Sequence, residues 1–106
     1  MTLVVRVLDL KPPADQEARV AVQEAFEGFA DQAGWRVTVS WDEQREGFAV
    51  FFKRDGTEVG RTVVPNEVAE AAIGGLKVAI HDGVSAFLHG WSAGRSQAVG
   101  RHAPKP

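Results

Sequence analysis

Hydrophobic and polar residues alternate with a period of two through the middle of the chain, in three consecutive runs. In the first run, 35–41, Trp, Val, Val and Trp occupy every second position, with Arg, Thr and Ser between them. This alternation is typical of a strand with one buried face. The second and third runs, 47–53 and 57–64, are joined by a segment in which Asp55-Gly56 suits the positive φ angles of a tight hairpin. The three runs predict an antiparallel meander.

A further strand is predicted ahead of the meander. Residues 3–8 are Leu and Val apart from Arg6, so both faces of this strand are mostly apolar, and we expect it to lie inside the sheet. The strand should end before Pro12 and Pro13, because proline fixes φ and has no N–H to donate to a neighbouring strand.

Residues 14–33 predict a helix that packs on the sheet. Apolar residues recur there every three or four positions and form one stripe, and acidic residues lie in the first turn, near the positive end of the helix dipole. Gly34 is expected to end the helix in the left-handed conformation. In that arrangement Trp35 folds back onto Phe29 or Ala30, so the helix leads directly into the first strand of the meander.

A second helix is predicted over residues 66–91, where apolar residues again fall on one side. Its interior holds Gly74-Gly75 and Gly83, and each glycine inside a helix costs about 0.5–1 kcal/mol relative to alanine. The pattern is therefore consistent with one continuous helix, a kinked helix or two shorter helices. A strand over 76–81 is a less favoured alternative, because apolar and polar residues do not alternate cleanly there.

Together these elements predict a single α+β domain over residues 1–91, in the order β-α-β-β-β-α. Its four-stranded sheet is expected to be mainly antiparallel, with two helices packed on one face. Residues 92–106 lack apolar periodicity and are rich in glycine, serine and proline. Because this segment carries Arg, His and Lys but no acid, it is predicted to be a mobile basic C-terminal tail.

Over residues 15 to about 80, the order helix, three antiparallel strands, helix resembles the double-stranded-RNA-binding domain in topology. That family contacts phosphates through a basic cluster at the start of its last helix and through the loop between its first two strands. The matching segments here, 66–70 and 42–46, are acidic and would repel phosphate. The resemblance is therefore limited to the order of elements, which we interpret as an arrangement that many α+β domains share.

Composition narrows the range of functions. With 106 residues, of which 44% are hydrophobic and 25% charged, the chain matches one ordinary globular domain. The absence of cysteine excludes disulfides and thiolate metal sites, and it fits a reducing compartment. A net charge of −2 argues against a protein whose main task is to neutralise a phosphate backbone, while a local basic patch remains compatible. Without a membrane span or secretory signal in the pattern, we expect a cytoplasmic protein with no membrane partner.

The sequence Gly-Trp-Ser-Ala-Gly at 90–94 matches the G-x-S-x-G pattern of a hydrolase nucleophile elbow. That motif requires a strand-to-helix turn, followed along the chain by an acid and a histidine. Here the motif follows a predicted helix, and no acid lies downstream to orient His102. We interpret the segment as a glycine-rich helix ending and assign no catalytic residue, cofactor or metal from it.

Two other groups of residues carry acid–base chemistry. His81, Asp82 and His89 form the first group, but on one helix the two histidines are about 12 Å apart, too far to share an ion without a break in the helix. We interpret both imidazoles as facing solvent and keep a small enzyme that uses them as an alternative. The second group is the acidic segment 42–46, which we interpret as a solvated turn.

The sheet face opposite the Trp and Val residues of the first meander strand is the most informative predicted surface. The residues expected there are Arg6, Arg36, Thr38 and Ser40. The second meander strand adds either Phe51 and Lys53, which we take as the candidates, or the alternate set of its residues. This face favours a small interaction or regulatory module without catalytic activity, whose partner is a second copy, as a homodimer, or another protein. The alternative is a single-stranded nucleic-acid-binding module that uses this face and the basic tail.

Overall fold

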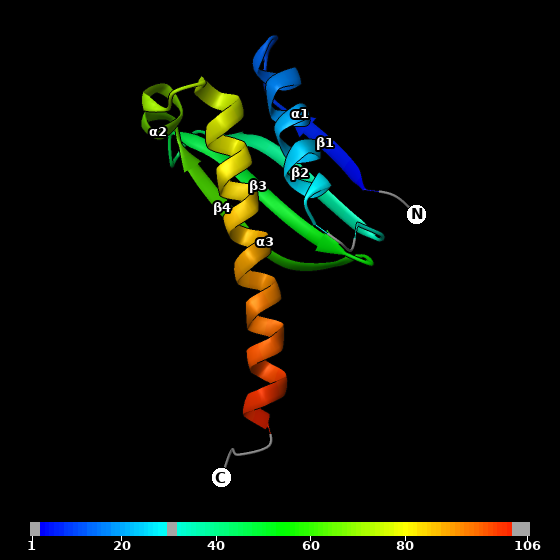
Figure 1. Ribbon diagram of the computed structural model, residues 1–106. Helices are drawn as coiled ribbons and strands as arrows, with labels where there is room; N and C mark the ends of the chain where they lie inside the picture. Colours follow the sequence, from blue (N-terminus) through cyan, green and yellow to red (C-terminus); the bar gives the residue numbers. More distant parts are fainter. Residues whose placement is uncertain (1–2, 30–31, 103–106) are drawn as a thin grey trace.

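The computed structural model describes residues 3–29 and 32–102, with 94–102 described by their backbone, and it contains one α+β domain (Figure 1). Its elements, in chain order, are β1 (Val4–Leu8), α1 (Ala14–Glu27), β2 (Trp35–Asp42), β3 (Gly47–Arg54), β4 (Thr57–Pro65), α2 (Asn66–Ala71) and α3 (Gly75–His102). The helices lie on one face of the sheet, as the sequence predicts (Figure 1). We call the opposite sheet face, which the helices leave uncovered, the open face.

The sheet is mixed, in the order β1-β2-β3-β4. β2, β3 and β4 form the predicted antiparallel meander, while β1 pairs parallel to β2. The parallel pairing follows from α1, which returns the chain across the sheet between these two strands. The prediction that residues 3–8 lie inside the sheet is wrong, because β1 is an edge strand. Its apolar residues divide between the helix side, with Val5, and the open face, where Val4 and Leu8 are 39% and 41% exposed.

The hairpin between β3 and β4 forms where the Asp-Gly pair predicts it. Asp55 and Gly56 have φ angles of 52° and 84°, and two consecutive positive φ angles match the strand twist of a two-residue hairpin. The Asp55 backbone N–H donates a hydrogen bond of 2.9 Å to the Gly34 carbonyl oxygen. Gly34 itself has φ of 80°, and a Cβ there would collide with the Asp55 carboxylate. This contact joins the hairpin tip to the start of β2.

α1 ends at Glu27, earlier than the residue 33 that the periodicity predicts. Gln32 ends the helix through its side chain, since its Nε2 donates a hydrogen bond of 2.8 Å to the Phe26 carbonyl oxygen. The Phe29 N–H donates to the same oxygen at 2.9 Å. The predicted contact between Trp35 and Phe29 is nevertheless confirmed, with ring centroids 6.0 Å apart. Ala30, the other predicted contact of Trp35, lies outside the described residues.

The segment predicted as the second helix is split in two at Ala72–Gly74, and the alternatives of an unbroken helix and of a strand over 76–81 are wrong. Gly74 and Gly75 adopt φ angles of 95° and 72°, which interrupt a right-handed helix. α3 then continues to His102, so the G-x-S-x-G segment lies inside a helix rather than at its end. The backbone of 92–102 is helical, and the mobility predicted for 92–106 stays a prediction.

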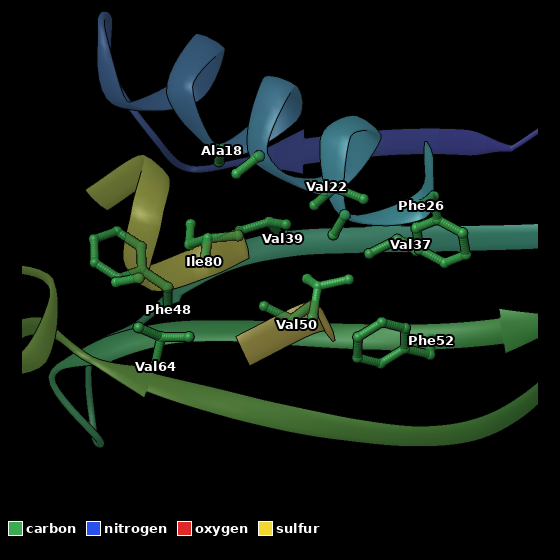
Figure 2. Packing of buried hydrophobic residues seen from close by; sticks show 14 of the residues in the cluster. Ala18, Val22, Phe26, Val37, Val39, Phe48, Val50, Phe52, Val64 and Ile80 are labelled. Carbon is green, nitrogen blue, oxygen red and sulfur yellow. The ribbon is translucent and has the colours of Figure 1, made fainter. Parts of the chain in front are cut away.

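The hydrophobic core lies between the sheet and the two long helices (Figure 2). Phe26 of α1 and Ile80 of α3 are fully buried against the sheet residues Val37, Val50 and Phe52. Alanines on the inner side of α1 let the helix backbone approach the sheet closely. The core continues into an aromatic cluster around Trp35, which is 1% exposed and contacts the rings of Phe26, Phe29, Phe52 and Trp91.

Gly60 of β4 lies close to α3, because a Cβ at that position would lie 2.6 Å from the Phe87 ring. That ring stacks on Phe52 with centroids 3.9 Å apart, so it has little freedom to move. We expect Gly60→Ala to reduce the free energy of unfolding by about 1–3 kcal/mol, as overpacked cores do. Urea unfolding followed by circular dichroism measures the change.

Gly90→Ala is the matched control, because a Cβ at Gly90 has no neighbour within 4 Å. We expect that variant to be neutral or slightly more stable, since alanine favours the helix. In a Phe87→Ala background, the cost of Gly60→Ala should largely disappear. An equal cost of Gly60→Ala with and without the Phe87 ring would contradict the described contact.

Candidate functional site

The open face presents three rows of side chains that run across the four strands. In the middle row, the strand register aligns Arg6, Thr38, Phe51 and Arg61, one from each strand. Neighbouring strands are about 4.8 Å apart, so the two arginines stand at opposite edges of a row about 14 Å wide. The half-buried Phe51 ring is therefore placed between two guanidinium groups.

The next row toward the β3–β4 hairpin aligns Val4, Arg36, Lys53 and Glu58. Arg36 and Lys53 stand directly opposite each other on neighbouring strands, and like charges in this position destabilise a sheet. Both side chains are exposed. The pair therefore concentrates positive charge at this place on the open face.

The third row is apolar or small and aligns Leu8, Ser40, Ala49 and Val63. Ala49 is only 4% exposed although it lies on the open face. The open face thus has an apolar end next to β1's last residue and a cationic end next to the β3–β4 hairpin. Polar and apolar ligand groups can both be accommodated on it.

All six residues that the sequence predicts for this face lie on it, at the register positions given above: Arg6, Arg36, Thr38, Ser40, Phe51 and Lys53. The sequence reasoning missed Arg61. In a regular hairpin from Asp55-Gly56, Arg61 would stand opposite Val50 and point to the helix side. A β-bulge between Phe52 and Lys53 shifts the register, so Arg61 pairs with Phe51 instead.

The four cations of the open face have no ionic partner among the described residues: Arg6, Arg36, Lys53 and Arg61. Of the acids on this face, Asp42 is engaged with Arg45, whose Nη1 lies 2.8 Å from Asp42 Oδ2. Glu58 stands opposite Lys53 in the register but makes no ion pair with it. The positive charge on this face is therefore available to an anion.

A hollow of about 380 Å³ lies at the cationic end of the open face. It is lined by the first residues of β1 and β2, the end of β3 and the hairpin: Val4, Gly34, Trp35, Arg36, Lys53, Asp55 and Gly56. Two cations and one carboxylate therefore border it, and the Asp55 carboxylate lies 4.0 Å from Arg54 Nε. The hollow extends the cationic row rather than forming a separate enclosed site.

The acidic segment 42–46 forms the turn between β2 and β3, as predicted. Asp42 Oδ1 accepts hydrogen bonds from the backbone N–H groups of Gln44, at 3.1 Å, and Arg45, at 3.2 Å. The hydrogen bond from the Arg45 side chain, assisted by these backbone donors, lowers the pKa of the Asp42 carboxyl below its ordinary value of 3.8. A carboxylate held ionised in this way stabilises the turn and is a poor proton donor.

The histidine cluster lies on the other side of the molecule, on α3. His81 and His89 both line a cleft between α1 and α3, whereas Asp82 is exposed outside it. His81 Nδ1 lies 3.5 Å from Asp82 Oδ1. The predicted orientation toward solvent fits the exposed His89, while His81 is half-buried at the cleft wall. The structure thus brings the two imidazoles to one cavity and leaves the carboxylate at its rim.

Within 3–29 and 32–102, no group of three or more histidine or acidic side chains is arranged to hold a metal ion. In the same part of the chain, no helix combines the length and apolar character needed to cross a bilayer. The described surfaces with chemistry of interest are the open face and the cleft between α1 and α3.

The Asp42 turn generates a pH-dependent prediction. Because the folded-state pKa of Asp42 is lowered, its carboxylate contributes stability at pH values above 3.8, and this contribution is lost as the pH falls through the lowered folded-state pKa. We expect NMR titration of the Asp42 carboxyl to give a midpoint below 3.8, and Arg45→Ala to raise that midpoint. In urea unfolding, the difference in the free energy of unfolding between the wild type and Asp42→Asn should shrink as the pH falls through the folded-state pKa of Asp42. An unchanged midpoint in Arg45→Ala would contradict the assigned cause.

No protein-family model matches the chain, and no curated protein matches its sequence. What the chain binds must therefore be inferred from the burial, charge and geometry of its own residues.

Proposed function

We propose that this chain is a non-catalytic binding module whose open sheet face binds single-stranded nucleic acid. One observation carries the proposal: Phe51 lies in register between Arg6 and Arg61, beside a second row that contains Arg36 and Lys53. Proteins that bind single strands combine an aromatic ring, on which a base stacks, with cations that follow the phosphates. The open face supplies both on a rigid sheet.

The placement of Phe51 favours a single strand over a duplex. The ring belongs to an inner strand of the sheet and is half-buried, so it lies among its neighbours and is reached only from the open face. A base must therefore come to the ring, which requires an unstacked base. In duplexes the bases are paired and stacked, and sequence-specific RNA recognition accordingly uses single-stranded segments.

The repulsion between Arg36 and Lys53 also favours an anionic ligand on the open face. Arg36 and Lys53 repel each other across the strand pair, and a phosphate placed between them would replace this repulsion with two attractions. Thr38 and Ser40 add hydroxyl groups that can donate to and accept from a sugar or a base edge. A cytoplasmic location, which the sequence predicts, would give the module access to such ligands.

The proposed nucleic-acid site consists of the open face and does not include the basic C-terminal segment. α3 lies on the helix side and runs beyond the sheet, away from the open face (Figure 1). The basic residues after Ser92 therefore begin on the opposite layer from Phe51. The proposed site on the open face does not depend on contacts between these basic residues and the bound oligonucleotide.

Fluorescence anisotropy with a short labelled oligonucleotide of mixed sequence tests the proposal. We expect saturable binding to single-stranded DNA or RNA and much weaker binding to the matching duplex. Phe51→Leu keeps an apolar side chain but removes the ring, and it should weaken binding by about 1–3 kcal/mol, the value of one stacked base. Each of Arg36→Gln and Arg61→Gln should weaken binding and lower the salt slope by about 0.7.

Lys11→Gln is the matched control, because Lys11 is exposed in the loop after β1 and is not a member of the three rows. It removes the same charge and should leave the affinity nearly unchanged. Thermal unfolding of every variant shows whether the fold is intact. Equal losses for Lys11→Gln and Arg61→Gln would indicate a general charge effect and contradict a site on the open face, and binding of an acidic protein but no oligonucleotide would favour a protein partner.

The homodimer predicted from the sequence stays a prediction, and the charges indicate which surface it can use. Two open faces brought together would place the cations of one copy against those of the other, which costs energy. We therefore expect light scattering after size exclusion to show the same number of protomers with and without the oligonucleotide, and a mass increase of one bound oligonucleotide per protomer. A dimer that the oligonucleotide dissociates would contradict this expectation, because it would show that the open face is the dimer interface.

A further inference from the structure

A cleft of about 330 Å³ lies between α1 and α3, on the helix side of the sheet. Its apolar part comes from both helices and the loop after α1, and its polar part from α3 and one residue of α1. The lining residues are Glu24, Ala25, Gly28, Phe29, His81, Ser85, Leu88, His89 and Ser92. None of them belongs to the open face, so the cleft is independent of the proposed nucleic-acid site.

The polar residues of α3 follow one line along the cleft. His81, Ser85 and His89 recur at every fourth position, so successive side chains lie one above the other on the same face of the helix. The two imidazoles are separated by about 12 Å along the helix axis, with the Ser85 hydroxyl between them. Below this line Leu88 and Ala25, 3% and 8% exposed, form an apolar floor. The cleft therefore combines an apolar surface with hydrogen-bonding groups along one wall.

Gly28 keeps the cleft open on the α1 side. A Cβ at this position would have no neighbour within 4 Å. Its φ angle of −87° is accessible to any residue, so the backbone does not require glycine there. Because Gly28 is part of the cleft lining, a larger side chain there has open space at the edge of the cleft and does not strain the chain.

The charge of the cleft depends on the imidazoles. The charged groups around them are Glu24 of α1 and Lys77 and Asp82 of α3. Glu24 Oε2 lies 3.4 Å from Lys77 Nζ, so these two charges offset each other. Asp82 is exposed outside the cleft and faces His81 alone. With Glu24 and Lys77 offsetting each other, a proton on either imidazole would give the cleft a positive charge.

We propose that this cleft binds a small amphiphilic carboxylate. The hydrocarbon body of the ligand lies on Ala25, Phe29 and Leu88, and its carboxylate accepts hydrogen bonds from a protonated imidazole and the Ser85 hydroxyl. A singly charged head group is favoured over a phosphate because Glu24 is part of the wall. The volume is at the lower end of the range for small-molecule sites, which suits a short chain.

NMR titration of the full chain with hexanoate tests this site, with hexanol as a probe that has the same hydrocarbon chain but no charge. At about pH 5.5 we expect saturable shifts of the His81 and His89 ring signals, and an affinity for hexanoate about tenfold higher than at pH 7.5. Hexanol should bind weakly and equally at both pH values. No saturable shift at the lower pH, or equal hexanoate affinity at both, would overturn the proposal.

Variants separate the cleft from a general surface effect. Gly28→Leu should abolish binding of both probes, whereas Gly90→Leu, which makes the same change on α3 outside the cleft lining, should leave it intact. Replacing both histidines, His81→Gln with His89→Gln, should remove the pH dependence and retain the weak hexanol binding. Unaltered hexanoate binding in folded Gly28→Leu would overturn the site. Oligonucleotide binding should be unchanged in Gly28→Leu, so the two proposals fail separately.

Discussion

The burial of Trp35 is the interaction on which the rest of the structure depends. Its ring contacts Phe26 of α1, Phe52 of β3 and Trp91 of α3, so both long helices and the inner strands of the sheet meet at one side chain. Aromatic pairs in this edge-to-face geometry contribute beyond the area they bury. The Arg54 guanidinium, 5.8 Å from the Trp35 ring centroid, covers the outer side of the cluster. The orientation of the helix layer relative to the sheet follows from these contacts.

Once the helices are held on one face, the other face contributes little to stability and is free for other chemistry. This division explains why Arg36 and Lys53 can stand opposite each other: the core supplies the stability that their repulsion reduces. It also explains why a single ring, Phe51, is present among cations on a surface that the helices do not cover. The proposed binding role gives both observations a function.

The cleft between α1 and α3 arises from the same arrangement. Small residues on α1 bring that helix close to the sheet and to α3, and Gly28 leaves the gap between the helices unfilled at its end. The floor of the cleft is therefore the outer surface of the core. A ligand in it would contact the helix layer only, while a nucleic acid would contact the sheet only. The two surfaces lie on opposite sides of one sheet and can be studied separately.

The sequence by itself determined the elements whose signals are local. Alternation at period two placed Trp35 and Arg36 on opposite faces of the first meander strand, and Asp55-Gly56 located the hairpin, because strand geometry and turn geometry depend on neighbouring residues. Only the tertiary structure decided features that depend on distant residues. These are the edge position of β1, the bulge that brings Arg61 beside Phe51, and the meeting of His81 and His89 at a cleft whose other wall is α1. Strand order, register and the space between helices follow from packing between segments far apart in the chain, which no local pattern records.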